Sequence, residues 1–398
     1  MKILHAVLSQ GFYGSERYCV ELASAQARAG HQVEVLIEGP GSDCARIFRD
    51  ETRAATTAIA AQRGAGRLGL TIMPAWLPAW LHRPFAWRAL GRFKPDIVHS
   101  HLNPAGRRVG GVAQKLGIPH VATLHIDYEP REHADCDGVI AVASWQRGRI
   151  GPEFRGDAAV IWNWLPAAMH AALARTTPAE RAELRETWGA DRATMVIGSI
   201  GRLMPVKGMD LLVRAFRLAF PHGDEPVALV ILGDGPQRGE LARYAAGDDR
   251  IMLLRPQPEI AALYRALDVF VSAARFEPFG LAILEAMAAG LPLVLTRTEG
   301  PREFVTDERV SWVEPDDEIG LAGALKAALE RGHHKIPYDL GRFAPQRALM
   351  EIEAFYHRVL ARSARLNGRG IPRRGRSRGN PAPAPRRPRS PPPRGPRW

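Results

Sequence analysis

The chain has 398 residues, of which 46% are hydrophobic and 24% are charged, which is the usual composition of a globular enzyme. Its formal net charge of +12 resides entirely in residues 362–398, which contain twelve Arg and no acidic residue, whereas residues 1–361 hold 42 basic and 42 acidic residues. The charge therefore gives no sign of a basic nucleic-acid-binding domain, and we expect no specific nucleic acid partner.

The first half of the chain alternates short apolar runs with helical patterns. We expect a strand at residues 2–9, a helix from Ser15 to Ala29 that Gly30 ends, and a second strand at residues 32–37. Further strands are expected at residues 96–101, 119–125, 138–143 and 159–163. Continuously apolar strands that alternate with helices are typical of a parallel sheet covered by helices on both faces.

The second half repeats this organisation. Strands are expected at residues 195–201, 228–233, 250–254, 268–273, 292–296 and 310–313, and helices at residues 178–188, 320–331 and 347–362. We therefore predict an α/β protein with two Rossmann-like, doubly wound parallel-sheet domains, residues 1–165 and 166–345. A helix at residues 346–362 closes the folded part. Residues 363–398 form an Arg/Pro-rich tail that we expect to be disordered, because it has few apolar residues to bury.

The segment ARFEPFGLAILEAMAAG (274–290) follows an expected strand and opens a helix. Pro278 and Gly280 keep Glu277 in the loop, and Glu285 falls about one turn inside the helix. The amides of Phe279, Gly280 and Leu281 point out of the helix N-terminus, which attracts anions. The loop thus offers recognition of a phosphate and of sugar hydroxyls, with a plainly capped helix as the alternative.

Two other glycine-containing turns follow strands. In GSIGRLMPVKGMDLL (198–212), Arg202 and Lys207 flank a loop before a helix, which suits a diphosphate. In LSQGFYGSER (8–17), Gly11 and Gly14 precede a helix, so the backbone there is able to approach a phosphate, although a plain tight turn is the more ordinary interpretation.

Together these segments resemble glycosyltransferase family 4, whose members are retaining sugar transferases of the GT-B fold. The likeness rests on the E-x7-E pair Glu277 and Glu285, on GRLMPVKG (201–208) as an Arg–Lys donor-phosphate loop, and on ILGDGP (231–236). It departs from the family's usual pattern at Tyr13, which precedes Gly14 where a glycine is common, and at Trp164. Glu299, Gly300 and Glu303 match a further loop less closely.

The resemblance implies a nucleotide-diphosphate sugar held mainly by the C-terminal domain. Arg202 and Lys207 would neutralise the diphosphate, Glu277 would hold the sugar hydroxyls and Glu285 the ribose. Gly14 would approach the donor from the opposite wall, and His125 would lie near the transferred sugar. Catalysis would then need positioning and charge stabilisation, with no protein nucleophile and no metal or other cofactor.

Three weaker signals stay open. Asp135-Cys136-Asp137 is a DxD sequence, but it precedes a strand, so we interpret it as surface or helix-capping acids. His99 and His101 alternate on one strand face and suit either a metal or, as we favour, a core or cleft pair. Residues 73–94 contain three Trp and several basic residues but no acid, which fits either a helix packed on the sheet, as we slightly favour, or a membrane-interfacial surface.

We expect a cytoplasmic hexosyltransferase, peripheral at the inner face of the membrane if residues 73–94 or the tail bind anionic lipid. The three cysteines make no paired framework, and MKILHAVLSQ has the pattern of a strand rather than of a signal peptide. The donor is expected to be a UDP-hexose rather than a GDP-hexose. The expected acceptor is a glycan or lipid-linked molecule such as a lipopolysaccharide core. The alternatives are an epimerase or phosphorolytic enzyme of the same fold, or a non-catalytic protein that binds anionic surfaces through its tail.

Overall fold

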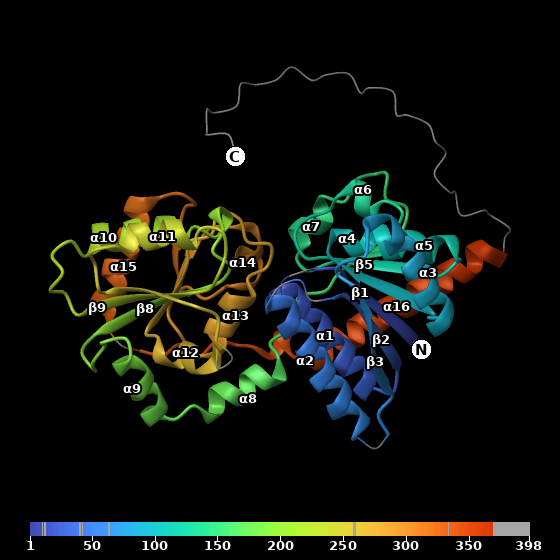
Figure 1. The fold of residues 1–398 in the computed structure, drawn as a ribbon. Helices are drawn as coiled ribbons and strands as arrows, with labels where there is room; N and C mark the ends of the chain where they lie inside the picture. The colour runs from blue at the N-terminus through green and yellow to red at the C-terminus, as the bar shows by residue number, and fades with distance from the viewer. Residues whose placement is uncertain are drawn as a thin grey trace.

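The computed structural model describes residues 1–9, 11, 13–39, 41, 43–62, 64–257, 260–332 and 334–368. Two α/β domains lie side by side, each built around one parallel sheet (Figure 1). The predicted fold class of two Rossmann-like domains is therefore confirmed. The predicted tail lies outside the described residues from residue 369 onward.

The N-terminal sheet has seven parallel strands in the order β3-β2-β1-β4-β5-β6-β7. They are β1 (Lys2–Val7), β2 (Gln32–Glu38), β3 (Arg67–Met73), β4 (Ile97–His101), β5 (His120–Leu124), β6 (Gly138–Ala141) and β7 (Asp157–Val160). The longer helices are α1 (Gly14–Arg28), α2 (Asp43–Ala60) and α3 (His82–Phe93). The shorter ones are η1 (Ala79–Leu81), α4 (Asn103–Ala105), the π-helical turn η2 (Gly106–Gly110), α5 (Gly111–Lys115), α6 (Pro130–His133) and α7 (Ser144–Gly148).

The C-terminal sheet has six parallel strands in the order β10-β9-β8-β11-β12-β13. They are β8 (Met195–Ile200), β9 (Val227–Leu232), β10 (Ile251–Leu254), β11 (Val269–Ser272), β12 (Leu293–Thr296) and β13 (Ser311–Val313). Its helices are η3 (Pro205–Lys207), α10 (Met209–Ala219), α11 (Arg238–Ala245), α12 (Ile260–Ala266), α13 (Leu281–Ala288), α14 (Glu299–Phe304) and α15 (Glu318–Arg331). The connecting helices α8 (Ala167–Arg175) and α9 (Pro178–Glu186) pack against α12.

Both faces of each sheet are buried, which is why its strands are continuously apolar. In β1, Ile3 and Val7 face a core shared with α1 and with the last helix, α16 (Pro345–Gly368). Leu4 and Ala6 face the opposite core, which is shared with α3 and α5. The chain thus crosses back after η4 (Gly341–Phe343) to cover the N-terminal domain with its last helix (Figure 1).

Three elements differ from the sequence-based prediction. Strand β3 was not predicted, because this edge strand is only partly buried and contains Gly69, so it lacks a continuous apolar run. Strand β7 begins two residues before the predicted one. Helix α16 continues to Gly368, so it includes six residues that we assigned to the tail. Ser363 is buried there, which shows that the packed side of the helix extends past residue 362.

The segment at residues 73–94 does not pack on the sheet through its Trp side chains. Helix α3 is anchored by the buried residues Ala86 and Leu90, whereas Trp76 and Trp80 are 80% and 75% exposed. Helix α3 therefore packs on the sheet, as we slightly favoured, through its small and aliphatic residues, and these two Trp side chains lie outside that contact. In the described part of the chain, no helix combines the length and apolarity needed to cross a bilayer.

The packing of the last helix, α16, on the core of the N-terminal domain can be tested by substitution. Phe355 is fully buried, and its ring approaches Gly138 so closely that a Cβ there would lie 2.9 Å from Phe355 Cζ. We expect Phe355→Ala to lower the free energy of unfolding of this domain by about 3–5 kcal/mol, because it leaves a cavity under α16. Urea denaturation followed by circular dichroism measures this. Met350→Ala on the exposed side of the same helix should change it by less than about 0.5 kcal/mol, and equal effects of the two variants would contradict the packing described.

Candidate active site between the two domains

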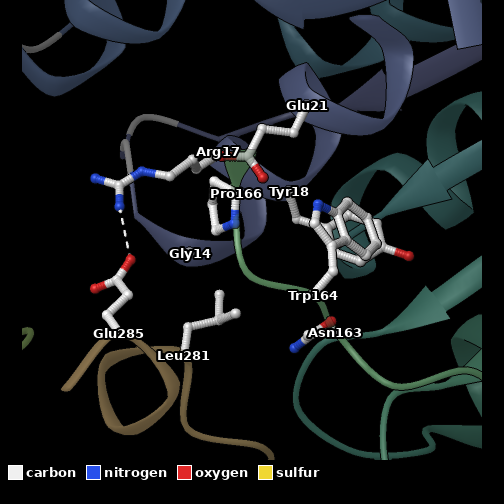
Figure 2. A pocket seen from close by; sticks show the side chains of 9 residues that line it. All are labelled: Gly14, Arg17, Tyr18, Glu21, Asn163, Trp164, Pro166, Leu281 and Glu285. Atoms are coloured by element: carbon white, nitrogen blue, oxygen red, sulfur yellow. Dashed lines mark hydrogen bonds and ion pairs between the residues drawn. The ribbon is translucent and has the colours of Figure 1, made fainter. Parts of the chain in front are cut away.

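A small pocket lies where the carboxyl edges of the two sheets face each other (Figure 2). Helix α1 and the segment after β7 form one side, and the start of α13 forms the other. The lining residues are Gly14, Arg17, Tyr18, Glu21, Asn163, Trp164, Pro166, Leu281 and Glu285. Ligands of open α/β sheets bind at such edges, so this location agrees with a binding site shared by both domains.

The loop after β8 brings Lys207 to the end of β11. Gly208 ends this loop with φ +64°, and a Cβ there would lie 1.9 Å from the carbonyl oxygen of Ala273, so only glycine fits. Lys207 Nζ donates to Glu277 Oε2 at 2.5 Å, and both side chains are partly exposed. The sequence placed the two residues in separate motifs, and the structure makes them an ion pair.

Arg275 fixes the relative position of these two loops, a role that sequence reasoning missed. Its guanidinium forms a two-pronged pair with Asp210, at 2.8 Å for each oxygen, and its backbone amide donates to Val206 at 2.9 Å. The hydrogen bonds to Asp210 raise the pKa of Arg275 above its usual range, so the cation is permanent. The position of Arg275 directly after a strand was the only signal available in the sequence.

The loop before α13 is held by glycines at two places. Gly280 is the N-cap of the helix with φ +107°, and it leaves the first amides of α13 pointing toward the gap between the domains. The Gly300 amide donates to the Glu277 carbonyl at 3.2 Å, and a Cβ on Gly300 would lie 2.4 Å from the Pro278 oxygen. Of the predicted residues, Phe279 directs its side chain into the core, where it stacks on Phe304.

Glu285 is buried at the pocket and joins the two domains. It accepts from Tyr264 at 2.7 Å within its own domain and from Arg17 Nη1 at 3.2 Å across the pocket (Figure 2). Burial raises the pKa of Glu285, and the neighbouring Arg17 opposes that shift. The structure therefore brings both Glu residues of the E-x7-E pair to the same side of the gap, each paired with a cation.

The turn before α1 contains its own anion. Glu16 is buried and accepts from the Tyr13 amide at 3.0 Å and from the hydroxyls of Ser9 and Ser15. This carboxylate already satisfies donors at the start of α1, so the turn is not a free phosphate cradle. Gly14 instead permits close approach of the domains, since a Cβ there would lie 2.9 Å from Leu281 Cδ1.

Arg202 and His125 reach the same gap from different domains. The Arg202 guanidinium lies over the ring of Tyr13, 4.4 Å from its centroid, so it faces the N-terminal domain. His125 follows β5, and its ring meets the edge of Tyr18, a pocket residue, at a centroid distance of 5.0 Å. Burial lowers the pKa of His125 to about 4, so its imidazole is neutral at physiological pH.

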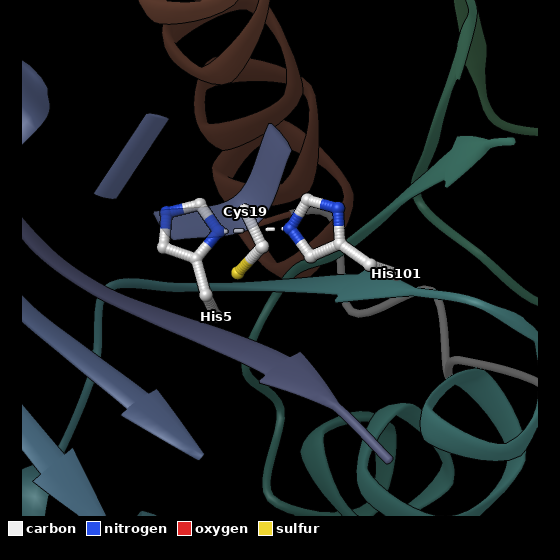
Figure 3. Close-up of side chains that lie close together, drawn as sticks. All are labelled: His5, Cys19 and His101. Carbon is white, nitrogen blue, oxygen red and sulfur yellow. Dashed lines mark hydrogen bonds between the residues drawn. The ribbon is translucent and has the colours of Figure 1, made fainter. Parts of the chain in front are cut away.

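His99 and His101 are buried core side chains, in agreement with the interpretation that we favoured. His99 bonds to Tyr356 at 2.5 Å and to Thr123 at 2.7 Å. His101 lies with His5 and Cys19 in a group whose ligand atoms are close enough for a metal ion (Figure 3). However, the two imidazoles are hydrogen-bonded to each other at 3.0 Å, and burial raises the pKa of the Cys19 thiol, so the group is satisfied as a neutral cluster.

Glu303, which matched the family pattern less closely, and Asp137 of the DxD sequence both have structural roles. Glu303 accepts from the amides of Ser144 and Trp145, each at 2.6 Å, and so caps α7 of the other domain. The Trp145 indole donates to the Pro278 oxygen at 2.9 Å, which ties the Glu277 loop to the N-terminal domain. In the DxD sequence, Asp135 is exposed, as expected for a surface acid, whereas Asp137 accepts from the amide of His120, the first residue of strand β5, at 2.9 Å and so through this bond holds a strand rather than a helix.

Comparison with known proteins agrees with this geometry. Residues 12–201 match the family model described as glycosyltransferase family 4, and residues 194–331 match glycosyl transferases group 1. A GDP-mannose-dependent alpha-mannosyltransferase of Mycolicibacterium smegmatis is 30% identical over 64% of this chain and 69% of its own length. A D-inositol 3-phosphate glycosyltransferase of Pseudarthrobacter chlorophenolicus is 29% identical over 84% and 86%, respectively. A glycosyltransferase from Rickettsia africae has a similar structure, with a TM-score of 0.72, 18% identity, and coverage of 90% of this chain and 98% of the other.

Two facing Rossmann-like domains with a site between them define the GT-B class of sugar-transferring enzymes. Together with the matches to both of its parts, they place the chain within that class. The chain belongs to glycosyltransferase family 4.

The buried imidazoles make the stability of the N-terminal domain depend on pH. Burial lowers the pKa of His5 from 6.5 to about 4 and that of His101 well below 6.5. At a pH between the native and the unfolded pKa of these histidines, the unfolded chain binds more protons than the native protein does. Acidification therefore favours unfolding. We expect the thermal midpoint of this domain to fall steadily as the pH is lowered from about 7 to about 5, above the range in which most carboxylates titrate. A constant midpoint in differential scanning calorimetry over this range would contradict the burial of neutral histidines.

Proposed function

We propose that this enzyme transfers a hexose from a nucleotide-diphosphate sugar to a glycan or lipid-linked acceptor, with retention of the anomeric configuration. The observation on which the proposal rests is the pairing of Lys207 with Glu277 at the ends of adjacent strands, beside the N-terminus of α13. A cation and a helix N-terminus suit a diphosphate, and a carboxylate suits sugar hydroxyls.

The proposed roles are those that the family resemblance implies, and the positions of these groups at the gap support them. Arg202 and Lys207 bind the diphosphate and stabilise it as the leaving group, assisted by the first amides of α13. Glu277 holds the sugar hydroxyls, Glu285 the ribose, and His125 contacts the transferred sugar. The departing phosphate accepts the proton of the acceptor hydroxyl, so in this proposal neither a protein nucleophile nor a metal takes part.

We propose a GDP-sugar as donor, in place of the UDP-hexose that we expected from the sequence. Several relatives are named as GDP-mannose-dependent alpha-mannosyltransferases. The names of the inositol-phosphate relatives specify an acceptor and no donor. A GDP-hexose, with mannose as the first sugar to test, is the donor that these names favour.

The acceptor is proposed to lie at an anionic membrane surface. Trp76, Trp80 and Trp87 are exposed on a segment that also has exposed Arg83 and Arg88, and such a mixture suits the interface between lipid headgroups and acyl chains. The Arg-rich residues that follow α16 in the sequence are a second candidate for binding the anionic surface. This arrangement would hold the enzyme peripherally at the inner face of the membrane.

Donor use gives the first test. With GDP-mannose and UDP-glucose offered separately to a cell-envelope extract, mass spectrometry should detect acceptor mannosylation that requires the protein. Lys207→Ala and Glu277→Ala should each lower kcat/KM by about 10²–10³-fold, because Lys207 stabilises the departing diphosphate and Glu277 holds the transferred sugar in this proposal. Lys326→Ala, an exposed lysine on α15, serves as the matched control.

Two outcomes would overturn the assignment. Donor isomerised without any acceptor would identify an epimerase. Sugar phosphate released in the presence of inorganic phosphate would identify a phosphorolytic enzyme. Preferential transfer from UDP-glucose would keep the transferase but reverse the choice of donor.

The membrane proposal has its own test. Cosedimentation with phosphatidylglycerol vesicles should fall about tenfold or more for the double substitution Trp76→Ser and Trp80→Ser, because each exposed indole contributes apolar area at the interface. Tyr244→Ser, on the exposed surface of the other domain, should leave binding unchanged.

Deletion of residues 369–398, which spares α16, should weaken vesicle binding and leave turnover on a soluble acceptor intact. If the deletion abolished turnover, the result would favour the alternative in which the tail is the functional element. Vesicle binding that survives the double Trp substitution would exclude this segment as the contact.

A further inference from the structure

A row of hydrogen bonds crosses the buried face of the N-terminal sheet and ends at His125. Gln26 Oε1 bonds to His5 Nε2 at 2.7 Å, His5 Nδ1 to His101 Nε2 at 3.0 Å, and His101 Nδ1 to His125 Nε2 at 3.1 Å. These four side chains, here called the imidazole row, come from α1, β1, β4 and the end of β5. In the register of these neighbouring strands His5 pairs with His99, and His101 pairs with Thr123. Each step from one imidazole of the row to the next is therefore displaced by two residues toward the carboxyl ends of the strands, so the row runs obliquely across the sheet toward the gap between the domains.

The orientation of the Gln26 amide determines which atom donates in each hydrogen bond of the row. Its Nε2 donates to the Tyr356 hydroxyl of α16 at 3.4 Å, which leaves Oε1 as the acceptor facing His5. His5 must then donate from Nε2, and a neutral imidazole has only one N–H. His5 Nδ1 therefore accepts from His101 Nε2, and His101 Nδ1 accepts in turn from His125 Nε2.

Neutral imidazoles are required for this assignment, and burial provides them. His5 and His101 are fully buried between the sheet, α1 and α16. Desolvation lowers the pKa of His5 and His125 to about 4 and that of His101 well below its usual value. A charged imidazole in the row would carry two N–H groups and would place two donors against each other.

We propose that Gln26, His5 and His101 are positioning residues that fix His125 as its Nε2–H tautomer. The Nδ1 lone pair of His125 is then the remaining ring nitrogen, available as an acceptor for a hydroxyl of the donor sugar. This deepens the proposed function and rests on it for the identity of the ligand, but the tautomer itself is a property of the resting protein.

The consequence for specificity is that His125 selects a hydrogen-bond donor. A sugar hydroxyl is able to donate to Nδ1, whereas a deoxy position offers nothing and leaves the acceptor unpaired. In the other tautomer, His125 would present an N–H, and the same position would favour an acceptor group on the ligand. The orientation of the Gln26 amide in α1 thus sets which nitrogen of His125 carries the proton. It acts through two imidazoles that do not contact the ligand.

The tautomer is measured directly by long-range ¹H–¹⁵N correlation spectra of protein labelled with ¹⁵N-histidine, with His125 assigned from a His125→Gln sample. We expect His125, His101 and His5 each to show a protonated Nε2 and an unprotonated Nδ1. A His125 ring protonated at Nδ1 or at both nitrogens would overturn the proposal. So would one equivalent of zinc retained by the purified protein, because a metal would replace the bond between His5 and His101.

Two matched variants separate positioning from simple structural support. Gln26→Met keeps the size of the side chain but removes the acceptor, so His125 should exchange between tautomers, and kcat/KM for the normal donor should fall about three- to tenfold. His120→Gln alters another buried histidine of β5, which bonds to Ser100 on the opposite face of the sheet, and should leave the His125 spectrum unchanged. If His125 still showed a single Nε2–H tautomer in Gln26→Met, the imidazole row would not be what fixes that tautomer.

A series of monodeoxy donors completes the test. In the wild type one deoxy position should reduce kcat/KM, and in Gln26→Met the same deletion should cost less, because the acceptor is no longer fixed. Equal losses in both proteins would overturn the specificity role. An enzyme with the expected tautomer but no activity on any nucleotide sugar would contradict the proposed function and leave the tautomer assignment standing.

Discussion

In each domain the strand order reverses beside the first strand, so that β1 lies between β2 and β4, and β8 lies between β9 and β11. The chain segments that follow the two strands at such a point run to opposite faces of the sheet, and this leaves a crevice at the carboxyl edge of the sheet. Gly14 and Arg17 follow β1, Lys207 follows β8, and Glu277 follows β11. One topological constraint, applied twice, therefore gathers the whole candidate site into the gap between two facing edges.

Four of the charges in this gap are held in two pairs. Lys207 is bonded to Glu277, and Arg17 to Glu285 across the domains. Partly desolvated charges are costly without partners, so each pair offsets the cost of placing its charges in the gap. In the proposed complex the diphosphate takes over Lys207, which frees Glu277 for sugar hydroxyls.

The buried histidines show a different way to keep polar groups inside a core. They are neutral and linked to one another, to Gln26, to Thr123 and to Tyr356 of the last helix. Each hydrogen bond satisfies a group that burial would otherwise penalise. Because Tyr356 belongs to α16, the return of the chain to the N-terminal domain completes both its core and its hydrogen bonding. The last helix thereby supports the same sheet edge on which His125 lies.

The sequence by itself determined the alternation of strands and helices, the two-domain GT-B architecture and the family, because apolar periodicity and the E-x7-E and GRLMPVKG motifs are local properties of the chain. It also named Lys207, Glu277 and Glu285, which the structure brings to one side of the gap. It missed β3, whose partly exposed edge position interrupts the apolar run. It gave no indication that Arg275 braces Asp210, that Glu16 occupies the start of α1, or that Glu303 caps a helix of the other domain. The contacts of Arg275 and Glu303 join residues far apart in the chain, whereas those of Glu16 are local to the turn before α1. Only the tertiary structure therefore decided which of the polar residues face the site and which hold it in place.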